Sequence, residues 1–152
     1  MNCPYDLHAH STASDGTLAP AALMARAAAA GVKVMALTDH DTLAGLDEAA
    51  AAAAEQGIVF VPGVEVSVSW NKQTVHIVGL GVDRSNERLL AGLAGLAEYR
   101  DWSAREIGAR LAKAGIDGAF EGARALSNGH LIGRTHFARF LVQQGHADSI
   151  GQ

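Results

Sequence analysis

Short apolar segments alternate with helical segments through the first half of the chain. The segment 32–37 is largely apolar with β-branched members, which predicts a strand buried on both faces. Helices are predicted over 20–30 and 46–56, because Pro20 opens the first and Gly31 and Gly57 follow the two. The predicted strands are 5–8, 32–37, 58–61, 64–68 and 74–82, with a break at Pro62-Gly63 and a hairpin turn at Asn71-Lys72-Gln73.

This order of elements predicts an α/β fold, with a parallel sheet or barrel and helices outside it. After Asp83 the pattern is helical only. The predicted helices there are 87–96, 98–114, 119–125 and 135–144. We therefore expect a barrel portion over residues 1–84 and a helical insert or cap over 85–152. Four or five strands cannot close a barrel, which takes about eight, so we expect a fragment or truncated product that ends before barrel closure.

Composition narrows the classes of function. Hydrophobic residues form 49% of the 152 positions, enough for one domain with a sizeable core. The net charge of −4 and the lack of a basic run argue against a broad nucleic-acid surface, although a nucleotide or short RNA end remains compatible if metal ions add positive charge. Cys3 is the only cysteine. With no signal-peptide or membrane pattern, we expect a cytoplasmic protein with no membrane and no stable protein partner.

Four of the seven histidines lie on or beside predicted strands, each near an acid or another histidine. His8 and His10 are two apart on a strand that would extend the segment 5–8, so both side chains would point to one side and could chelate an ion. A hydrogen-bonded surface pair is the alternative. Asp15 precedes Gly16 in a polar loop, and either returns a carboxylate over the strand end or is a turn residue.

His40 stands between two acids, Asp39 and Asp41, directly after the predicted strand 32–37. Catalytic groups of α/β proteins gather at the carboxyl ends of strands. We therefore interpret His40 as a functional residue. Asp41 either shares that role or, like Thr42, caps the next helix.

Glu65 and His76 lie inside otherwise apolar predicted strands. A buried carboxylate is costly without a partner, and that partner would be a metal ion or an arginine. His76 is either a core histidine or a ligand, and its position one strand after Glu65 favours a ligand. The candidate ligands are His8, His10, Asp15, His40, Glu65 and His76. They are too many for one tetrahedral zinc and suit two or three Mn, Fe or Zn ions, which activate water as hydroxide for phosphoryl transfer.

The motifs in their order resemble the PHP (polymerase and histidinol phosphatase) family. They are Asp6-Leu7-His8-Ala9-His10-Ser11, Asp15-Gly16, Leu37-Thr38-Asp39-His40-Asp41, Pro62-Gly63-Val64-Glu65-Val66-Ser67 and His76. The resemblance implies a distorted (β/α)7 barrel, a trinuclear metal centre held in part by the six candidate ligands, and a helical insert. The family pattern also needs a further histidine and an Asp-x-His near the end of a longer chain, and these positions are absent here.

Two further segments, 74–81 and 133–138, resemble the stand-alone bacterial members. Those members include 3′,5′-nucleoside bisphosphate phosphatases and 5′→3′ exoribonucleases. The resemblance implies a phosphoesterase acting on a nucleotide or a short oligoribonucleotide. In the mechanism that we expect, Asp15 or His40 also assists proton transfer, a role that the sequence does not separate from metal ligation. The alternatives are a non-catalytic or degenerate metal-binding PHP module of a larger protein, and a histidinol-phosphate phosphatase.

The helical segment should supply phosphate-binding groups. Arg134 and His136 stand at the start of the last predicted helix, where amide groups favour anions and an arginine adds bidentate recognition. Arg100 and Arg105 either add a second phosphate contact or belong to a solvated helix face. The remaining histidines, His130 and His146, are interpreted as surface residues, and Trp70 and Trp102 as packing or base-stacking residues.

Overall fold

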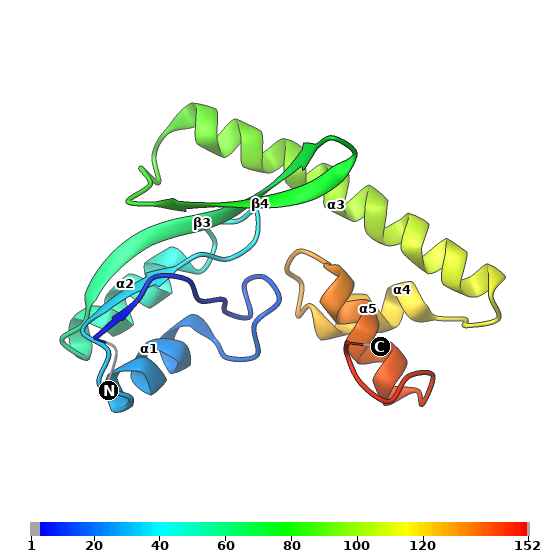
Figure 1. The fold of residues 1–152 in the computed structure, drawn as a ribbon, viewed down its shortest axis with the longest axis horizontal. Helices are drawn as coiled ribbons and strands as arrows, with labels where there is room; N and C mark the ends of the chain where they lie inside the picture. The colour runs from blue at the N-terminus through cyan, green and yellow to red at the C-terminus, as the bar shows by residue number, and fades with distance from the viewer. Residues whose placement is uncertain (1–3, 152) are drawn as a thin grey trace. The chain divides into compact units, whose positions relative to one another are not determined.

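The computed structural model describes residues 4–151, and its contacts divide the chain into one unit up to Leu96 and another from Ala97. Figure 1 shows the elements along the chain. They are β1 Tyr5–Asp6, α1 Pro20–Ala29, β2 Val34–Leu37, α2 Leu46–Glu55, β3 Val59–Trp70, β4 Gln73–Leu80, α3 Glu87–Lys113, α4 Ala119–Leu126 and α5 Arg134–Gln143. Among the described residues, no helix is long and apolar enough to cross a membrane.

One sheet, in the order β1-β2-β3-β4, organises the first unit. The first three strands are parallel and β4 is antiparallel to β3. This agrees with the α/β class and the hairpin predicted from the sequence. The first strand is shorter than predicted: β1 ends at Asp6, so the residues that follow it, including His8, lie in a loop.

The predicted break at Pro62-Gly63 is wrong, because β3 is one strand of twelve residues. The strand changes partners here instead of ending. Pro62 is the last residue opposite β2, where it pairs with Leu37, and Gly63 is the first opposite β4, where it pairs with Leu80. A Cβ atom on Gly63 would lie 2.8 Å from Cγ2 of Thr38 and 3.0 Å from the backbone carbonyl oxygens of Leu37 and Gly79. Glycine therefore permits the close approach of backbones at the exchange.

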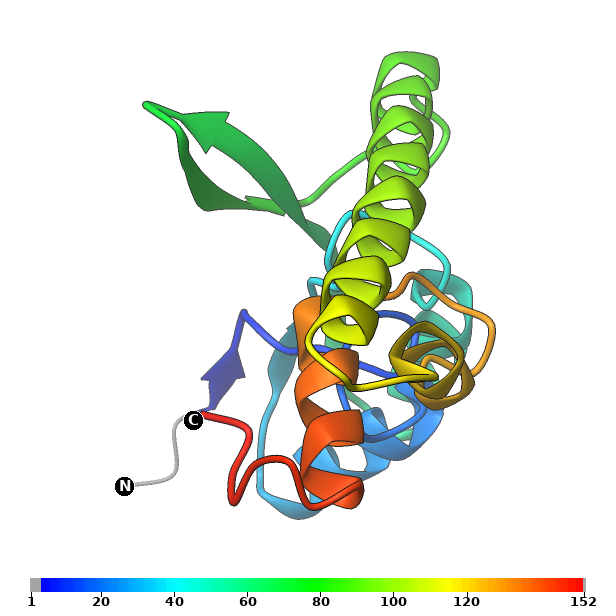
Figure 2. The ribbon, with the colours of Figure 1, turned by 90° about the vertical axis from the view of Figure 1, so that its right-hand side faces the viewer.

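The hairpin turn predicted between β3 and β4 is present. Asn71 and Lys72 have φ values of 47° and 64°, the left-handed conformation that a two-residue hairpin turn requires. Figure 2 shows the tip of this hairpin standing away from α1 and α2, and β4 is exposed along nearly its whole length.

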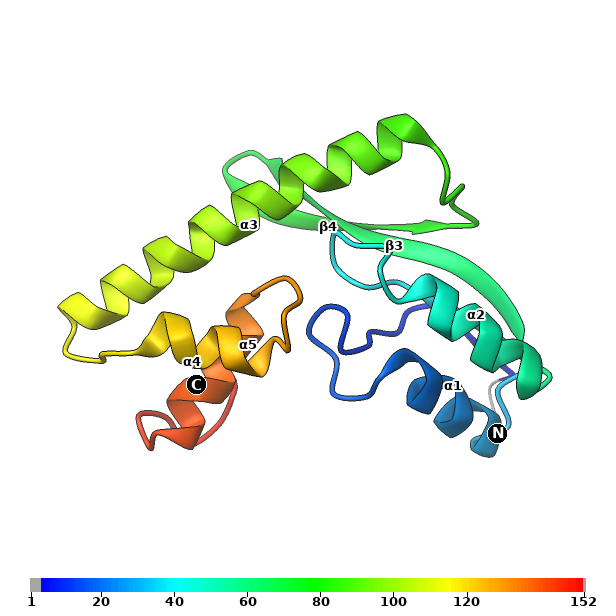
Figure 3. The same ribbon diagram turned by 180° about the vertical axis from the view of Figure 1, so that it is seen from behind.

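The core of the first unit lies between the sheet and two alanine-rich helices. Figure 3 shows α1 and α2 side by side against the strands. Met24 from α1, Met35 and Leu37 from β2, and Leu46 from α2 are fully buried there. Small alanines on α2 let the helix pack closely, and this packing fixes the strand ends on which the candidate ligands depend.

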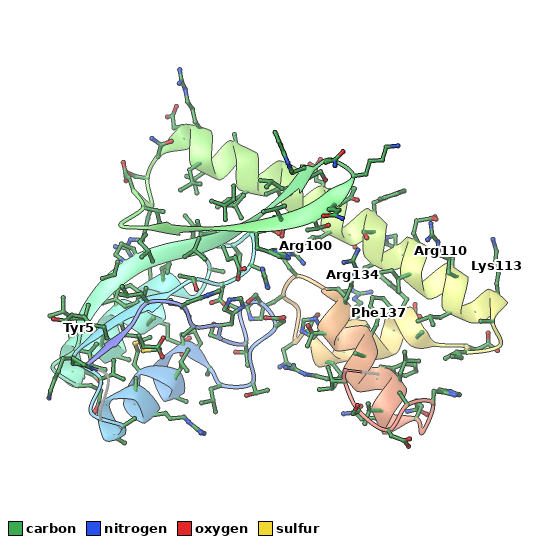
Figure 4. The ribbon with its side chains drawn as sticks, in the orientation of Figure 1. Tyr5, Arg100, Arg110, Lys113, Arg134 and Phe137 are labelled. Carbon is green, nitrogen blue, oxygen red and sulfur yellow. The ribbon has the colours of Figure 1, made fainter. Side chains whose placement is uncertain are left out.

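The second unit is helical. The two helices predicted over 87–96 and 98–114 are one continuous helix, α3, of which residues 97–113 belong to this unit. No proline interrupts α3, and its early glycines Gly92 and Gly95 stay helical. Ala104 of α3, Ala119 of α4 and Phe137 of α5 are buried together as a separate core. Figure 4 labels Phe137 on α5.

Candidate metal centre

The six predicted ligands come from four parts of the first unit and lie together. They are His8 and His10 in the loop after β1, Asp15 in the same loop before α1, His40 just after β2, Glu65 in β3, and His76 in β4. The prediction that His8 and His10 share a strand is wrong, but both imidazoles still reach Glu65. The loop, not strand alternation, directs them.

Glu65 is at the centre of the cluster, with a side chain only 8% exposed. Its Oε2 atom lies 2.9 Å from Nε2 of His8, 2.8 Å from Nε2 of His10 and 3.6 Å from Nδ1 of His40. Its Oε1 atom lies 3.9 Å from Nδ1 of His76. The four imidazoles therefore surround one buried carboxylate, and the interactions described for Glu65 are with histidine instead of arginine.

Asp15 supplies a second carboxylate on the other side of two of these rings. Its Oδ1 atom lies 3.0 Å from Nδ1 of His10, and its Oδ2 atom lies 4.0 Å from Nε2 of His40. His10 thus has a carboxylate at each ring nitrogen. The rings of His10 and His40 meet edge to face, with centroids 4.5 Å apart.

The ligand atoms fall into three groups, in each of which they all lie within 4.8 Å of one another. The groups are His8-His10-Glu65, His10-Asp15-His40 and His40-Glu65-His76. Every group mixes imidazole nitrogen with carboxylate oxygen, the donor set that Mn, Fe and Zn accept. Because His10, His40 and Glu65 each belong to two groups, the residues fit a cluster of adjoining ions with shared ligands.

The charges of the cluster shift two pKa values in opposite directions. Burial by itself lowers the pKa of His10, but the hydrogen bond and charge of Asp15 and the charges of Glu65 and Asp39 outweigh it, so the pKa rises above its ordinary 6.5. Burial by itself raises the pKa of Glu65, but the hydrogen bond from His8 and the positive charges of neighbouring histidines lower it below its ordinary 4.5. The cluster therefore favours an ionised Glu65 carboxylate beside protonated imidazole rings. A divalent cation can take the place of the positive charge that these protons supply.

His76 is exposed, with 41% of its side chain accessible, so it is not a core histidine. Its Nδ1 atom lies 3.3 Å from Oγ of Ser67. The exposure leaves His76 accessible from the solvent side of β4.

Backbone pairing holds His40 against Glu65. The N–H of Glu65 donates to the carbonyl of Asp39 at 3.2 Å, and the N–H of Asp41 donates to the carbonyl of Glu65 at 3.0 Å. The Oδ1 atom of Asp41 accepts the N–H of Ser67 at 2.6 Å. Neither Asp41 nor Thr42 caps α2, whose N-cap residue is Gly45. Asp39 and Asp41, the acids on either side of His40, are both buried. The sequence did not predict this burial, and the only signal for it was that two acids directly flank one histidine.

The predicted phosphate-binding residues lie in the second unit, apart in the chain from the metal ligands. Arg134 is the exposed first residue of α5 (Figure 4). Arg100 of α3 is close to it in space, because a Cβ atom on Gly133 would lie 3.6 Å from Nη1 of Arg100. His136 is buried, and its Nδ1 atom accepts the N–H of Gly133 at 3.0 Å, so it caps α5. Phosphate binding by these residues stays a prediction.

Arg105 has an ion-pair partner on its own helix. Its Nε atom lies 2.9 Å from Oδ2 of Asp101, and its guanidinium lies 5.0 Å from the ring centroid of Phe120. Of the two interpretations of Arg105, these contacts favour the solvated, ion-paired helix face.

Comparison with known proteins gives consistent matches. The sequence model described as "PHP domain" matches residues 6–150. A 5′-3′ exoribonuclease of Haemophilus influenzae is 50% identical over all of the chain and 55% of its own length. A 3′,5′-nucleoside bisphosphate phosphatase of Chromobacterium violaceum is 56% identical over 92% of the chain and 50% of its own length.

A solved structure is also closely similar. It is described as an amidohydrolase from Chromobacterium violaceum with bound sulfate and no metal, and it superposes with a TM-score of 0.94 at 52% identity. The match covers 98% of this chain and 53% of that one. The chain therefore spans about half the length of the relatives that it matches.

Proposed function

The chain belongs to the PHP domain family, and on that premise we propose that it carries metal ligands of a phosphoesterase that acts on a nucleotide 3′,5′-bisphosphate or the 5′ end of a short RNA. The fold is the α/β half-barrel expected for part of a PHP domain. The observation that carries the proposal is Glu65, a buried carboxylate surrounded by four imidazoles and adjoined through His10 by Asp15.

Two or three divalent ions bound here would supply a hydroxide nucleophile and neutralise charge on the phosphoryl oxygens. His8, His10, His40 and His76 would offer ring nitrogens, and Glu65 and Asp15 would offer carboxylate oxygens. Mn, Fe and Zn all suit this donor set. The chain's residues must be deprotonated to hold the ions, which gives the binding a dependence on pH.

Proton transfer is assigned to Asp15 or His40. The Oδ2 atom of Asp15 and the Nε2 atom of His40 lie 4.0 Å apart at the cluster, so either could accept a proton at that point. Each is also a proposed ligand, and the two roles separate by experiment: a ligand variant loses an ion, whereas loss of a base lowers kcat with the ions still bound.

Phosphate recognition is assigned to Arg134 and Arg100, with His136 at the same helix start. The solved relative holds a sulfate, which shares the tetrahedral shape and negative charge of phosphate, and this supports anion binding by a protein of this fold. The N-terminus of α5 adds partial positive charge beside Arg134. The names of the relatives support a nucleotide or RNA substrate.

The test is release of phosphate or nucleotide by the protein, with Mn²⁺ present. Adenosine 3′,5′-bisphosphate and a 5′-phosphorylated short oligoribonucleotide are compared with histidinol phosphate at equal concentration. We expect turnover of the first two, loss of turnover in the chelator EDTA, and at least about a 100-fold loss in His8→Ala. Metal binding without turnover of any of the three would instead favour a non-catalytic PHP module, and preference for histidinol phosphate would favour that phosphatase.

A further inference from the structure

A buried carboxylate that is not among the candidate ligands lies under the loop that carries Asp15. Asp39 is only 1% exposed. Its Oδ1 atom accepts the N–H of Ser11 at 2.8 Å and the hydroxyl of Ser14 at 2.6 Å, and its Oδ2 atom accepts the hydroxyl of Ser11 at 2.7 Å. Three donors from one loop therefore compensate the burial of one carboxylate, which would otherwise be costly.

The loop that donates these bonds is tight. The N–H groups of Ser14 and Gly16 both donate to the carbonyl of Ser11, at 3.1 and 2.9 Å. A Cβ atom on Gly16 would lie 2.3 Å from the carbonyl oxygen of His10, so only glycine fits there. Asp15, between Ser14 and Gly16, is thus held with its Oδ1 atom 3.0 Å from Nδ1 of His10.

Asp39 is absent from all three groups of candidate ligands. Its carboxylate oxygens are directed to the loop, while its backbone carbonyl accepts the N–H of Glu65. It also directly precedes His40. Asp39 therefore connects the three segments that carry Asp15, His40 and Glu65. Of these segments, its side chain contacts only the loop that carries Asp15.

We propose that Asp39 is a positioning residue that sets the affinity of one ion, the ion held by His10, Asp15 and His40, by fixing the loop through Ser11 and Ser14. The inference rests on the metal cluster of the proposed function. The other two groups, His8-His10-Glu65 and His40-Glu65-His76, contain no residue from 11–16. Ser14 directly precedes Asp15, so loss of the contact between Ser14 and Asp39 weakens the ion that includes Asp15 and leaves the others nearly unchanged.

The test is a titration of the metal-free protein with Co²⁺, which reports each ion by its visible spectrum and by the number bound per chain. Ser14→Ala removes one bond to Asp39 and keeps the rest. Removal of a group that orients a ligand typically weakens a metal by about 10–100-fold, and we expect that loss for one ion only. Asp39→Ala, which removes all three bonds, should lose at least as much.

A conservative replacement of Asp39 separates its hydrogen bonds to the loop from its negative charge. Asp39→Asn keeps an oxygen that can accept from both the Ser11 N–H and the Ser14 hydroxyl, so it should bind the ion more tightly than Asp39→Ala does. Equal loss in Asn and Ala variants would overturn the positioning role. Ser127→Ala is the matched control, because Ser127 is also a buried serine, and its hydroxyl donates to the carbonyl of Arg124 in the second unit. It should leave every ion unchanged.

A double-mutant cycle decides whether the effect passes through Asp15. In an Asp15→Asn background, Ser14→Ala should weaken no ion further, because the ion that depends on the loop has already been lost. Additive losses, equal weakening of all ions, or no weakening would overturn the proposal, as would a wild-type protein that binds no Co²⁺.

Ion binding with this pattern but without turnover would contradict only the phosphoesterase proposal, since the titration does not depend on activity. Thermal unfolding of each metal-free variant identifies any that misfolds, and Ser14→Ala then decides alone.

Discussion

The Nε2 atom of His10 lies 2.8 Å from the Oε2 atom of Glu65, between residues that come from the loop after β1 and from β3. When His10 is protonated, this contact is an ion pair between its imidazolium ring and the carboxylate. A bound ion would take the place of that proton. Protons and metal ions therefore compete for the same ring nitrogens. As pH rises through the raised pKa of His10, the stability of the metal-free protein should fall, whereas its affinity for metal ions should increase.

The metal-free protein should be most stable at mildly acidic pH. The pKa of His10 is raised above 6.5, so its contribution to stability is fully present below pH 6.5 and is lost as pH rises through the raised pKa. The pKa of Glu65 is lowered below 4.5, so its contribution is present above pH 4.5 and is lost as pH falls through the lowered pKa. Melting temperatures in EDTA should be highest between these limits, and His10→Gln should flatten the alkaline side. A melting temperature that rises steadily above pH 6.5 would contradict this assignment.

Metal affinity should show the opposite slope on the alkaline side. Each imidazole must lose its proton before it can bind an ion, so affinity for Mn²⁺ should increase from pH 6 to pH 8 and binding should release protons. Calorimetric titration in two buffers with different ionisation enthalpies measures that release. Binding independent of both pH and buffer would mean that the histidines are not the ligands.

Glu65 and Asp15 should differ in how many ions each controls. Glu65 belongs to two ligand groups and Asp15 to one. Glu65→Gln should therefore weaken two ions and Asp15→Asn one, each by at least about 100-fold, since loss of an outer contact alone costs about 10–100-fold. Ion counts per chain by elemental analysis measure this, with Asp47→Asn, an exposed acid on α2, as the control. Equal counts for the two variants would exclude Glu65 as a shared ligand.

Gly63→Ala should destabilise the protein at the point where β3 changes partners. The new methyl would lie 2.8 Å from Cγ2 of Thr38 and 3.0 Å from the carbonyl oxygen of Leu37. Overpacking of this kind costs about 1–3 kcal/mol in the free energy of unfolding, measurable by urea denaturation. Gly95→Ala, in α3 with open space around the new methyl, should leave stability unchanged or raise it by up to about 1 kcal/mol. Similar effects at both positions would contradict the crowding at Gly63.

Arg134→Ala should raise KM for a phosphorylated substrate about 10-fold or more and change kcat less, because a hydrogen bond to a charged group contributes about 1.5–3 kcal/mol. Arg110→Ala, on the exposed face of α3, is the control (Figure 4). An unchanged KM for Arg134→Ala would remove this residue from the phosphate site.

The candidate ligands that could be predicted from the sequence are those whose position depends on neighbouring residues in the chain. His40 follows a strand, and Glu65 and His76 interrupt apolar strands, so the end of the sheet where they gather could be predicted. The helices α1 and α2 could also be predicted, because proline and glycine mark their limits.

Features that depend on distant partners could not be predicted. Pro62-Gly63 looks like a break because proline and glycine commonly end strands. The exchange of partners that takes place there instead involves β2 and β4, which are far apart in the sequence. The contribution of Asp39 requires a loop that folds back over it from residues 11–14. Nothing in the local sequence distinguishes Asp39 from a helix cap or a ligand.

The exposure of β4 has a consequence for the behaviour of this chain at high concentration. β4 is an edge strand in the described sheet, and Ile77 and Leu80 on it are 55% and 45% exposed. An open edge that carries apolar side chains is a template for intermolecular strand pairing. Association of chains through β4 would therefore increase the light scattering of a concentrated sample.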